Sequence, residues 1–148
     1  MLAGCDVVTS GGPLDRASAL QQSQSDLPLP PSAHDIYYLH VDQGTQQHYL
    51  FVRFSGDLKD IADFAAAKYE KQNEFLKGLG RPIVEPVLDT GKQAMARKPW
   101  GNYRKLPNWW HPENIQKGRY IGSGAKAIDD QHFWIDEEKG EAFFYGHY

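Results

Sequence analysis

The chain has 148 residues, which suits one domain with a short additional segment. Hydrophobic residues make up 41% of it, which is enough for a core, and a formal net charge of −3 gives no general attraction for nucleic acid or anionic membranes. The single cysteine excludes an internal disulfide and a multi-cysteine zinc site. No apolar run approaches the roughly 20 residues that a membrane-spanning helix needs.

The only cysteine lies close to the start of the chain, at the end of the run Leu2-Ala3-Gly4-Cys5. This run of four residues resembles the lipobox of bacterial lipoproteins. The resemblance implies a signal peptide, cleavage before Cys5 and lipidation of the Cys5 thiol. Acyl chains anchor a protein at about 0.8 kcal/mol per buried CH₂ group. The chain is therefore expected to be lipid-anchored in the bacterial cell envelope, with its domain in the periplasm or outside the cell.

Residues 6–33 are rich in Ser, Gln, Gly and Pro and contain no aromatic residue. Such a composition buries too little apolar surface to offset the entropy of ordering. We therefore expect a flexible tether between the lipidated cysteine and a single globular domain over residues 34–148. The helical alternative within this segment is a short stretch at residues 14–22.

The first regular elements are predicted after residue 33. Residues 34–41 and 47–54 are rich in aromatic and β-branched types, and residues 42–45 between them are typical of a turn. They predict an antiparallel hairpin. Asp57 is then a suitable N-cap for a helix over residues 58–77. The predicted apolar stripe of this helix consists of Leu58, Ile61, Ala62, Ala65, Tyr69 and Leu76.

The second half of the chain predicts mainly strands. Residues 81–87 contain two prolines and therefore indicate an edge strand. Residues 131–136 and 141–145 predict a second hairpin, and residues 119–122 a strand before it. The expected fold class is α+β, with an antiparallel sheet built from two hairpins and one long helix packed on it.

The most unusual stretch of the sequence is residues 92–110, where five basic residues occur with no acidic one and alternate with aromatic rings. Cations beside flat rings suit an anionic or protein partner. Alternatively, this is a solvated loop in which at least one of Trp109 and Trp110 packs into the core. The predicted binding residues are Arg97, Lys98, Trp100, Tyr103, Arg104, Lys105, Trp109 and Trp110.

Metal and catalytic sites find less support. His40 and His48 flank the first turn and, with an acid such as Asp42, could bind a metal weakly, but such histidines are more often solvated strand residues. Ser123 lies between two glycines without the wider pattern of a nucleophile elbow. We therefore predict no metal, no cofactor and no catalytic residue.

The sequence thus favours a membrane-tethered envelope lipoprotein that acts as a binding or accessory protein through protein–protein contacts. One concrete version is an immunity-type lipoprotein that captures an incoming toxin. Two alternatives stay open. A small envelope hydrolase would require a deep pocket in which His111 or His132 faces a carboxylate or Ser123. A cytosolic nucleic-acid-binding domain would require the lipobox match to be accidental, and nucleic acid is not the expected partner.

Overall fold

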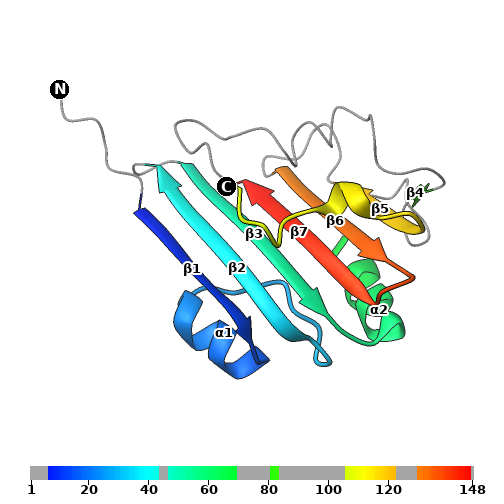
Figure 1. Ribbon diagram of the computed structural model, residues 1–148, viewed down its shortest axis with the longest axis horizontal. Coiled ribbons are helices and arrows are strands. Elements are labelled where there is room, and N and C mark those ends of the chain that lie inside the picture. Colours follow the sequence, from blue (N-terminus) through cyan, green and yellow to red (C-terminus); the bar gives the residue numbers. More distant parts are fainter. Residues whose placement is uncertain (1–6, 44–46, 70–80, 84–105, 123–129, 148) are drawn as a thin grey trace.

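A computed structural model describes residues 7–43, 47–69, 81–83, 106–122 and 130–147. These residues form a seven-stranded antiparallel sheet in the order β1-β2-β3-β7-β6-β5-β4, so the fold class is α+β (Figure 1). The strands are β1 (Val7–Leu14), β2 (His34–Gln43), β3 (Gln47–Ser55), β4 (Arg81–Ile83), β5 (Gly118–Gly122), β6 (Asp130–Asp136) and β7 (Glu141–His147). The helices are α1 (Arg16–Ser23), α2 (Leu58–Tyr69) and the 3-10 turn η1 (Pro112–Asn114).

Both predicted strand pairs are present, as β2 with β3 and β6 with β7. The turn between β6 and β7 is stabilised by Asp136, whose carboxylate accepts hydrogen bonds from the backbone of Glu138 and Lys139. Gly140 closes this turn with a φ of 63°, a conformation that favours glycine. The expectation that the sheet consists of two hairpins is nevertheless wrong, because β1 extends it on one side and β5 and β4 extend it on the other.

The N-terminal segment differs from the flexible tether that its composition predicted. β1 pairs along β2 from Val7 to Leu14, and α1 follows directly. Backbone hydrogen bonds to β2 hold β1 in place, while most of its side chains are exposed, so no apolar pattern marks the strand. The proline-rich end also packs on the sheet, since Leu27 and Leu29 are buried. Residues 7–33 are therefore part of the folded domain.

Two helices, rather than one long helix, cover the sheet in the described residues. The helix expected over residues 58–77 is observed as α2, and residues 70–77 lie outside the described part of the chain. Asp57 caps α2 as expected by accepting a hydrogen bond from the backbone of Asp60 at 3.1 Å. Ile61 and Ala65 of its predicted stripe are buried, whereas Leu58 is 39% exposed.

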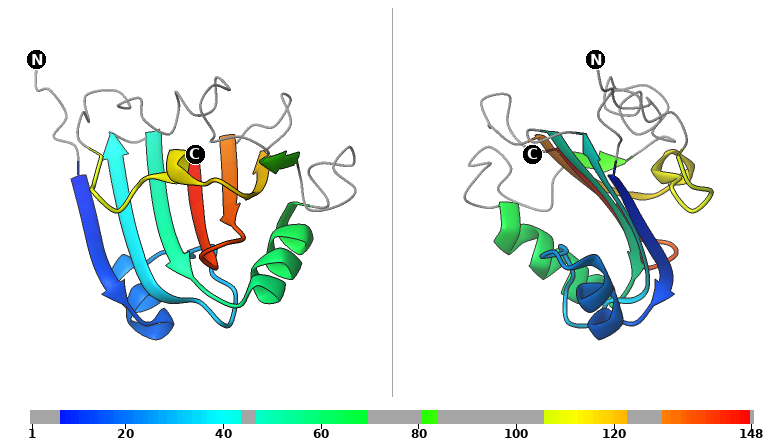
Figure 2. Two further views of the ribbon diagram at one scale, coloured as in Figure 1. Left: turned by 45° about the vertical axis from the view of Figure 1, so that its right-hand side comes forward. Right: turned by 90° about the vertical axis from the view of Figure 1, so that its left-hand side faces the viewer.

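The two faces of the sheet have different covers (Figure 2). We call the side that packs against α1 and α2 the helix face. Its core includes alternate residues of the central strands, such as Tyr38, Leu50, Val52 and Phe144. We call the opposite side, crossed by residues 106–117, the loop face, and its core is mostly aromatic. Strand alternation therefore decides on which face each candidate site residue lies.

Candidate functional site

The predicted lipidation residue and most of the predicted binding residues lie outside the described part of the chain. These are Cys5, Arg97, Lys98, Trp100, Tyr103, Arg104 and Lys105. Trp109 and Trp110 are described, at the start of the segment that crosses the loop face. No helix in the described residues is long and apolar enough to cross a bilayer.

Trp110 belongs to the core and not to a binding surface. It is 4% exposed, and its ring meets Phe51, Phe143 and Trp134 edge-on at centroid distances of 5.1, 5.7 and 5.8 Å. Edge-to-face aromatic contacts of this kind stabilise a core beyond the area that they bury. Its inclusion among the binding residues is corrected accordingly: Trp110 holds residues 106–117 against the sheet.

Trp109, in contrast, is only half-buried and remains accessible to a partner. Its ring lies 5.6 Å from that of Tyr37, and the guanidinium of Arg53 lies 5.5 Å from the centre of the Tyr37 ring. Arg53 also pairs with Glu141 at 2.9 Å, which fixes the position of its charge. Trp109, Tyr37 and Arg53 thus form a partly exposed patch of two aromatic rings and an ion-paired arginine on the loop face.

His132, which the hydrolase alternative invoked, is a core residue. It is 3% exposed, and its Nδ1 lies 2.6 Å from the hydroxyl of Tyr120. Its ring stacks with those of Trp134 and Tyr145, both at 5.8 Å. His132 is therefore buried among aromatic rings on the loop face, and Ser123 lies outside the described residues.

A shallow depression lies between α2 and the strands β5 and β6, with Lys59, Lys117 and Arg119 among its lining residues. Two of these cations already have carboxylate partners. Lys59 pairs with Asp63 at 2.6 Å, which raises the pKa of Lys59, and Arg119 lies 3.4 Å from Glu137. Because these partners neutralise the local charge, the depression is a weak candidate for an anion site.

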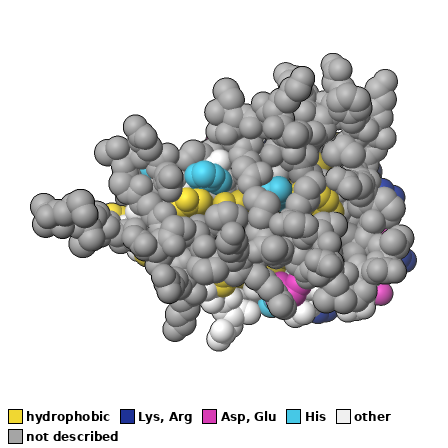
Figure 3. Space-filling view, turned by 90° about the horizontal axis from the view of Figure 1, so that it is seen from above, with side chains coloured by type: hydrophobic (Ala, Val, Ile, Leu, Met, Phe, Trp, Pro, Cys, Tyr) yellow, Lys and Arg dark blue, Asp and Glu magenta, His cyan; other side chains and the backbone are white. Residues whose placement is uncertain are grey.

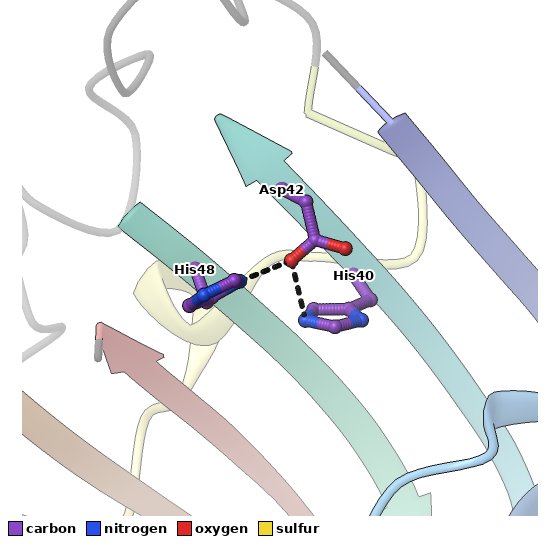
Figure 4. Close-up of side chains that lie close together, drawn as sticks. All are labelled: His40, Asp42 and His48. Atoms are coloured by element: carbon purple, nitrogen blue, oxygen red, sulfur yellow. Dashed lines mark hydrogen bonds and ion pairs between the residues drawn. The ribbon is translucent and has the colours of Figure 1, made fainter. Parts of the chain in front are cut away.

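Among the residues that the structure describes, one group of three could hold a metal ion: His40, Asp42 and His48 (Figure 4). Asp42 lies between the two rings: its Oδ1 is 3.2 Å from Nε2 of His40 and forms a hydrogen bond with Nδ1 of His48. The ligand atoms of the three residues lie within 4.8 Å of one another. Their side chains are 25%, 30% and 40% exposed, so the cluster is reachable from solvent.

Strand geometry accounts for this convergence. His40 and Asp42 are two residues apart on β2 and therefore project from the same face. Asp42 and His48 are directly opposed in the register of β2 and β3, so their side chains also share a face. Figure 4 shows the cluster on the side of the sheet away from residues 106–117, which is the helix face.

The cluster occupies the end of the sheet where β2 stops and β3 begins, at the top of Figure 1. Figure 3 looks onto this end and shows histidine side chains reaching the surface among hydrophobic ones. The sequence alone places His40 and His48 on either side of a turn, but it does not reveal that both rings approach the same oxygen of Asp42. That fact depends on the strand register.

Comparison with known proteins finds no relative: no protein-family model, no curated protein and no solved structure matches this chain.

Proposed function

We propose that this protein is a lipid-anchored binding protein of the bacterial cell envelope, and that it acts through protein–protein contacts. The observation that carries the proposal is the lipobox-like run Leu2-Ala3-Gly4-Cys5, which contains the only cysteine of the chain. A thioether-linked lipid at Cys5 would hold the domain at a membrane surface, because each buried CH₂ group contributes about 0.8 kcal/mol.

The position of β1 supports a close attachment. β1 begins at Val7, two residues after Cys5, so the chain between them spans at most about 7 Å when fully extended. An anchor at Cys5 would therefore place the end of the sheet that contains the start of β1 next to the membrane, without a long spacer. The membrane would then not cover the loop face, which would remain accessible to a partner protein.

The proposed partner is a protein, which the domain contacts through the basic and aromatic residues of the segment 97–109. The described part of this surface is the aromatic patch of Trp109, Tyr37 and Arg53. Half-buried aromatic rings and arginine are the residue types that contribute most to protein interfaces. An immunity-type lipoprotein that captures an incoming toxin is one concrete form of this function.

The anchor is tested by expressing the native gene in a bacterial host. Wild-type protein should sediment with membranes and resist extraction by high salt, while Cys5→Ser should remain in the aqueous fraction. A matched control is the double variant Cys5→Ser/Ser10→Cys, which keeps one thiol on the exposed strand β1 and should also be aqueous. Equal membrane association of wild type and Cys5→Ser would refute the anchor.

The binding surface is tested separately, with envelope extract and the intact protein as bait. A variant with five alanine substitutions should capture at least tenfold less of the protein that wild type captures. The substituted residues are Arg97, Lys98, Arg104, Lys105 and Trp109. Alanine at Lys59 and Lys139, which are exposed elsewhere, should leave capture unchanged. If the first set captures the partner as well as wild type does, the contact lies on another surface.

A further inference from the structure

We propose that His40, Asp42 and His48 bind one divalent transition-metal ion of the zinc type. Neutral imidazole nitrogen and carboxylate oxygen are standard ligands for Zn²⁺. The three residues offer two such nitrogens and one such oxygen, each directed toward the same small volume (Figure 4). The proposal does not depend on the lipid anchor or on the protein partner.

The spacing between His40 Nε2 and Asp42 Oδ1 fits two ligands of one metal ion. Tetrahedral Zn²⁺ with bonds of about 2.0–2.1 Å places neighbouring ligand atoms about 3.3 Å apart. His40 Nε2 and Asp42 Oδ1 are 3.2 Å apart, and all three ligand atoms lie within 4.8 Å of one another. His48 Nδ1 now forms a hydrogen bond with Asp42 Oδ1, so the His48 ring has to move away from this oxygen for all three atoms to surround an ion.

The backbone already holds the three ligands in place. They lie on two hydrogen-bonded strands in fixed register, with His40 opposite Leu50 and Asp42 opposite His48. Leu50 is 4% exposed and the intervening Val41 is 1% exposed, so both strands are anchored in the two cores at this point. Binding therefore orders few additional side-chain rotations, and this preorganisation favours affinity.

The site is also open enough for exchange with solvent. Three protein ligands leave at least one coordination position of a tetrahedral ion to water or to a group from another molecule. The partial exposure of all three side chains provides the route of entry. We expect a site of moderate affinity that gains and loses its ion reversibly.

A neighbouring histidine–carboxylate pair provides a matched control. His34 Nδ1 and Asp35 Oδ2 lie 2.9 Å apart on the same strand as His40, with side chains 61% and 66% exposed. This pair is not among the groups of three potential ligands in the described residues. If any exposed histidine beside an acid could bind the ion, replacing His34 would matter as much as replacing His48.

The experiment is titration of the tag-free full chain with ZnCl₂ by calorimetry, with circular dichroism to verify that each variant is folded. Wild type should bind one equivalent. His48→Gln and Asp42→Asn should each weaken binding at least tenfold, and His34→Gln should leave it unchanged. No saturable binding by wild type up to about 100 μM Zn²⁺, a concentration that half-fills a site with a Kd of that order, would overturn the proposal, as would equal binding by His48→Gln.

A measurement on wild type alone covers the case in which a variant does not fold. On addition of Zn²⁺, the ring resonances of His40 and His48 should shift in NMR spectra, and those of His34 and His111 should not. Shifts confined to His34 and His111, or spread equally over all the histidines, would contradict the assigned site.

Discussion

A single carboxylate determines where α1 begins. Asp15 is the N-cap, and its Oδ1 accepts a hydrogen bond of 2.8 Å from the backbone N–H of Ser18. This bond has the largest effect in lowering the pKa of Asp15, and a hydrogen bond from the Ser18 hydroxyl has the next largest. Because the folded-state pKa is lowered, the stabilisation is present above the ordinary pKa of aspartate and is lost as the pH falls through the lowered value.

We therefore expect Asp15→Ala to lower the midpoint of urea unfolding at pH 7, because the first turn of α1 loses its cap. Asp15→Asn is the matched control: it keeps a capping oxygen and should remain close to wild type. The difference between the urea midpoints of wild type and Asp15→Ala should become smaller in acid, because the Asp15 carboxylate of wild type is protonated there. If Asp15→Ala unfolds at the same urea concentration as wild type at pH 7, Asp15 does not stabilise α1.

At the scale of elements, the segment of residues 106–117 has no long helix or strand, yet it covers much of the loop face. Its attachment depends on a few side chains, chiefly Trp110 and Ile115, which are 4% and 1% exposed. The turn η1 inside this segment is held by backbone hydrogen bonds from Asn114 to His111 and from Ile115 to Pro112. Packing of aromatic rings therefore replaces regular secondary structure here.

Trp110→Ala should lower the free energy of unfolding by about 3–5 kcal/mol, because the loss of a buried tryptophan leaves a large cavity. Chemical denaturation followed by far-UV circular dichroism measures this change. Trp109→Ala is the matched control, and its effect should be clearly smaller because Trp109 is only half-buried. Equal effects of the two substitutions would contradict the assignment of Trp110 alone to the core.

Several of the helices and strands could be predicted from the sequence, and others could not. Runs of aromatic and β-branched residues separated by turn residues correctly indicated β2, β3, β6 and β7, and Asp57 indicated the start of α2. β1 could not be predicted, because backbone hydrogen bonds hold it while its side chains remain exposed. Its two glycines and its one proline also suggested an unstructured segment.

The candidate metal site could be predicted from the sequence only in part. The positions of His40 and His48 around a turn were visible in the sequence, but the site also needs Asp42 opposite His48, and a shift of one residue in register would send these side chains to opposite faces. For Trp109 and Trp110, the sequence indicated that at least one packs inward. Only the three-dimensional contacts identify Trp110 as that residue.

At the scale of the whole molecule, the two ends of the sheet differ. α1 and the start of α2 lie toward one end, whereas the start of β1 and the His40–Asp42–His48 cluster lie at the other (Figure 1). A lipid on Cys5 would bring the second end to the membrane, since only Asp6 separates Cys5 from β1. The proposed metal site and the proposed anchor would then share one end of the domain, and the aromatic patch on the loop face would be left for a partner.

The most direct test of the proposed envelope function is the mass of the N-terminal peptide from protein made from its native gene in bacteria. We expect a peptide that begins at Cys5 and carries the added mass of a diacylglycerol group on its sulfur. A peptide in which residues 1–4 still precede Cys5 and the thiol is unmodified would contradict the lipid anchor, and with it the assignment to the cell envelope.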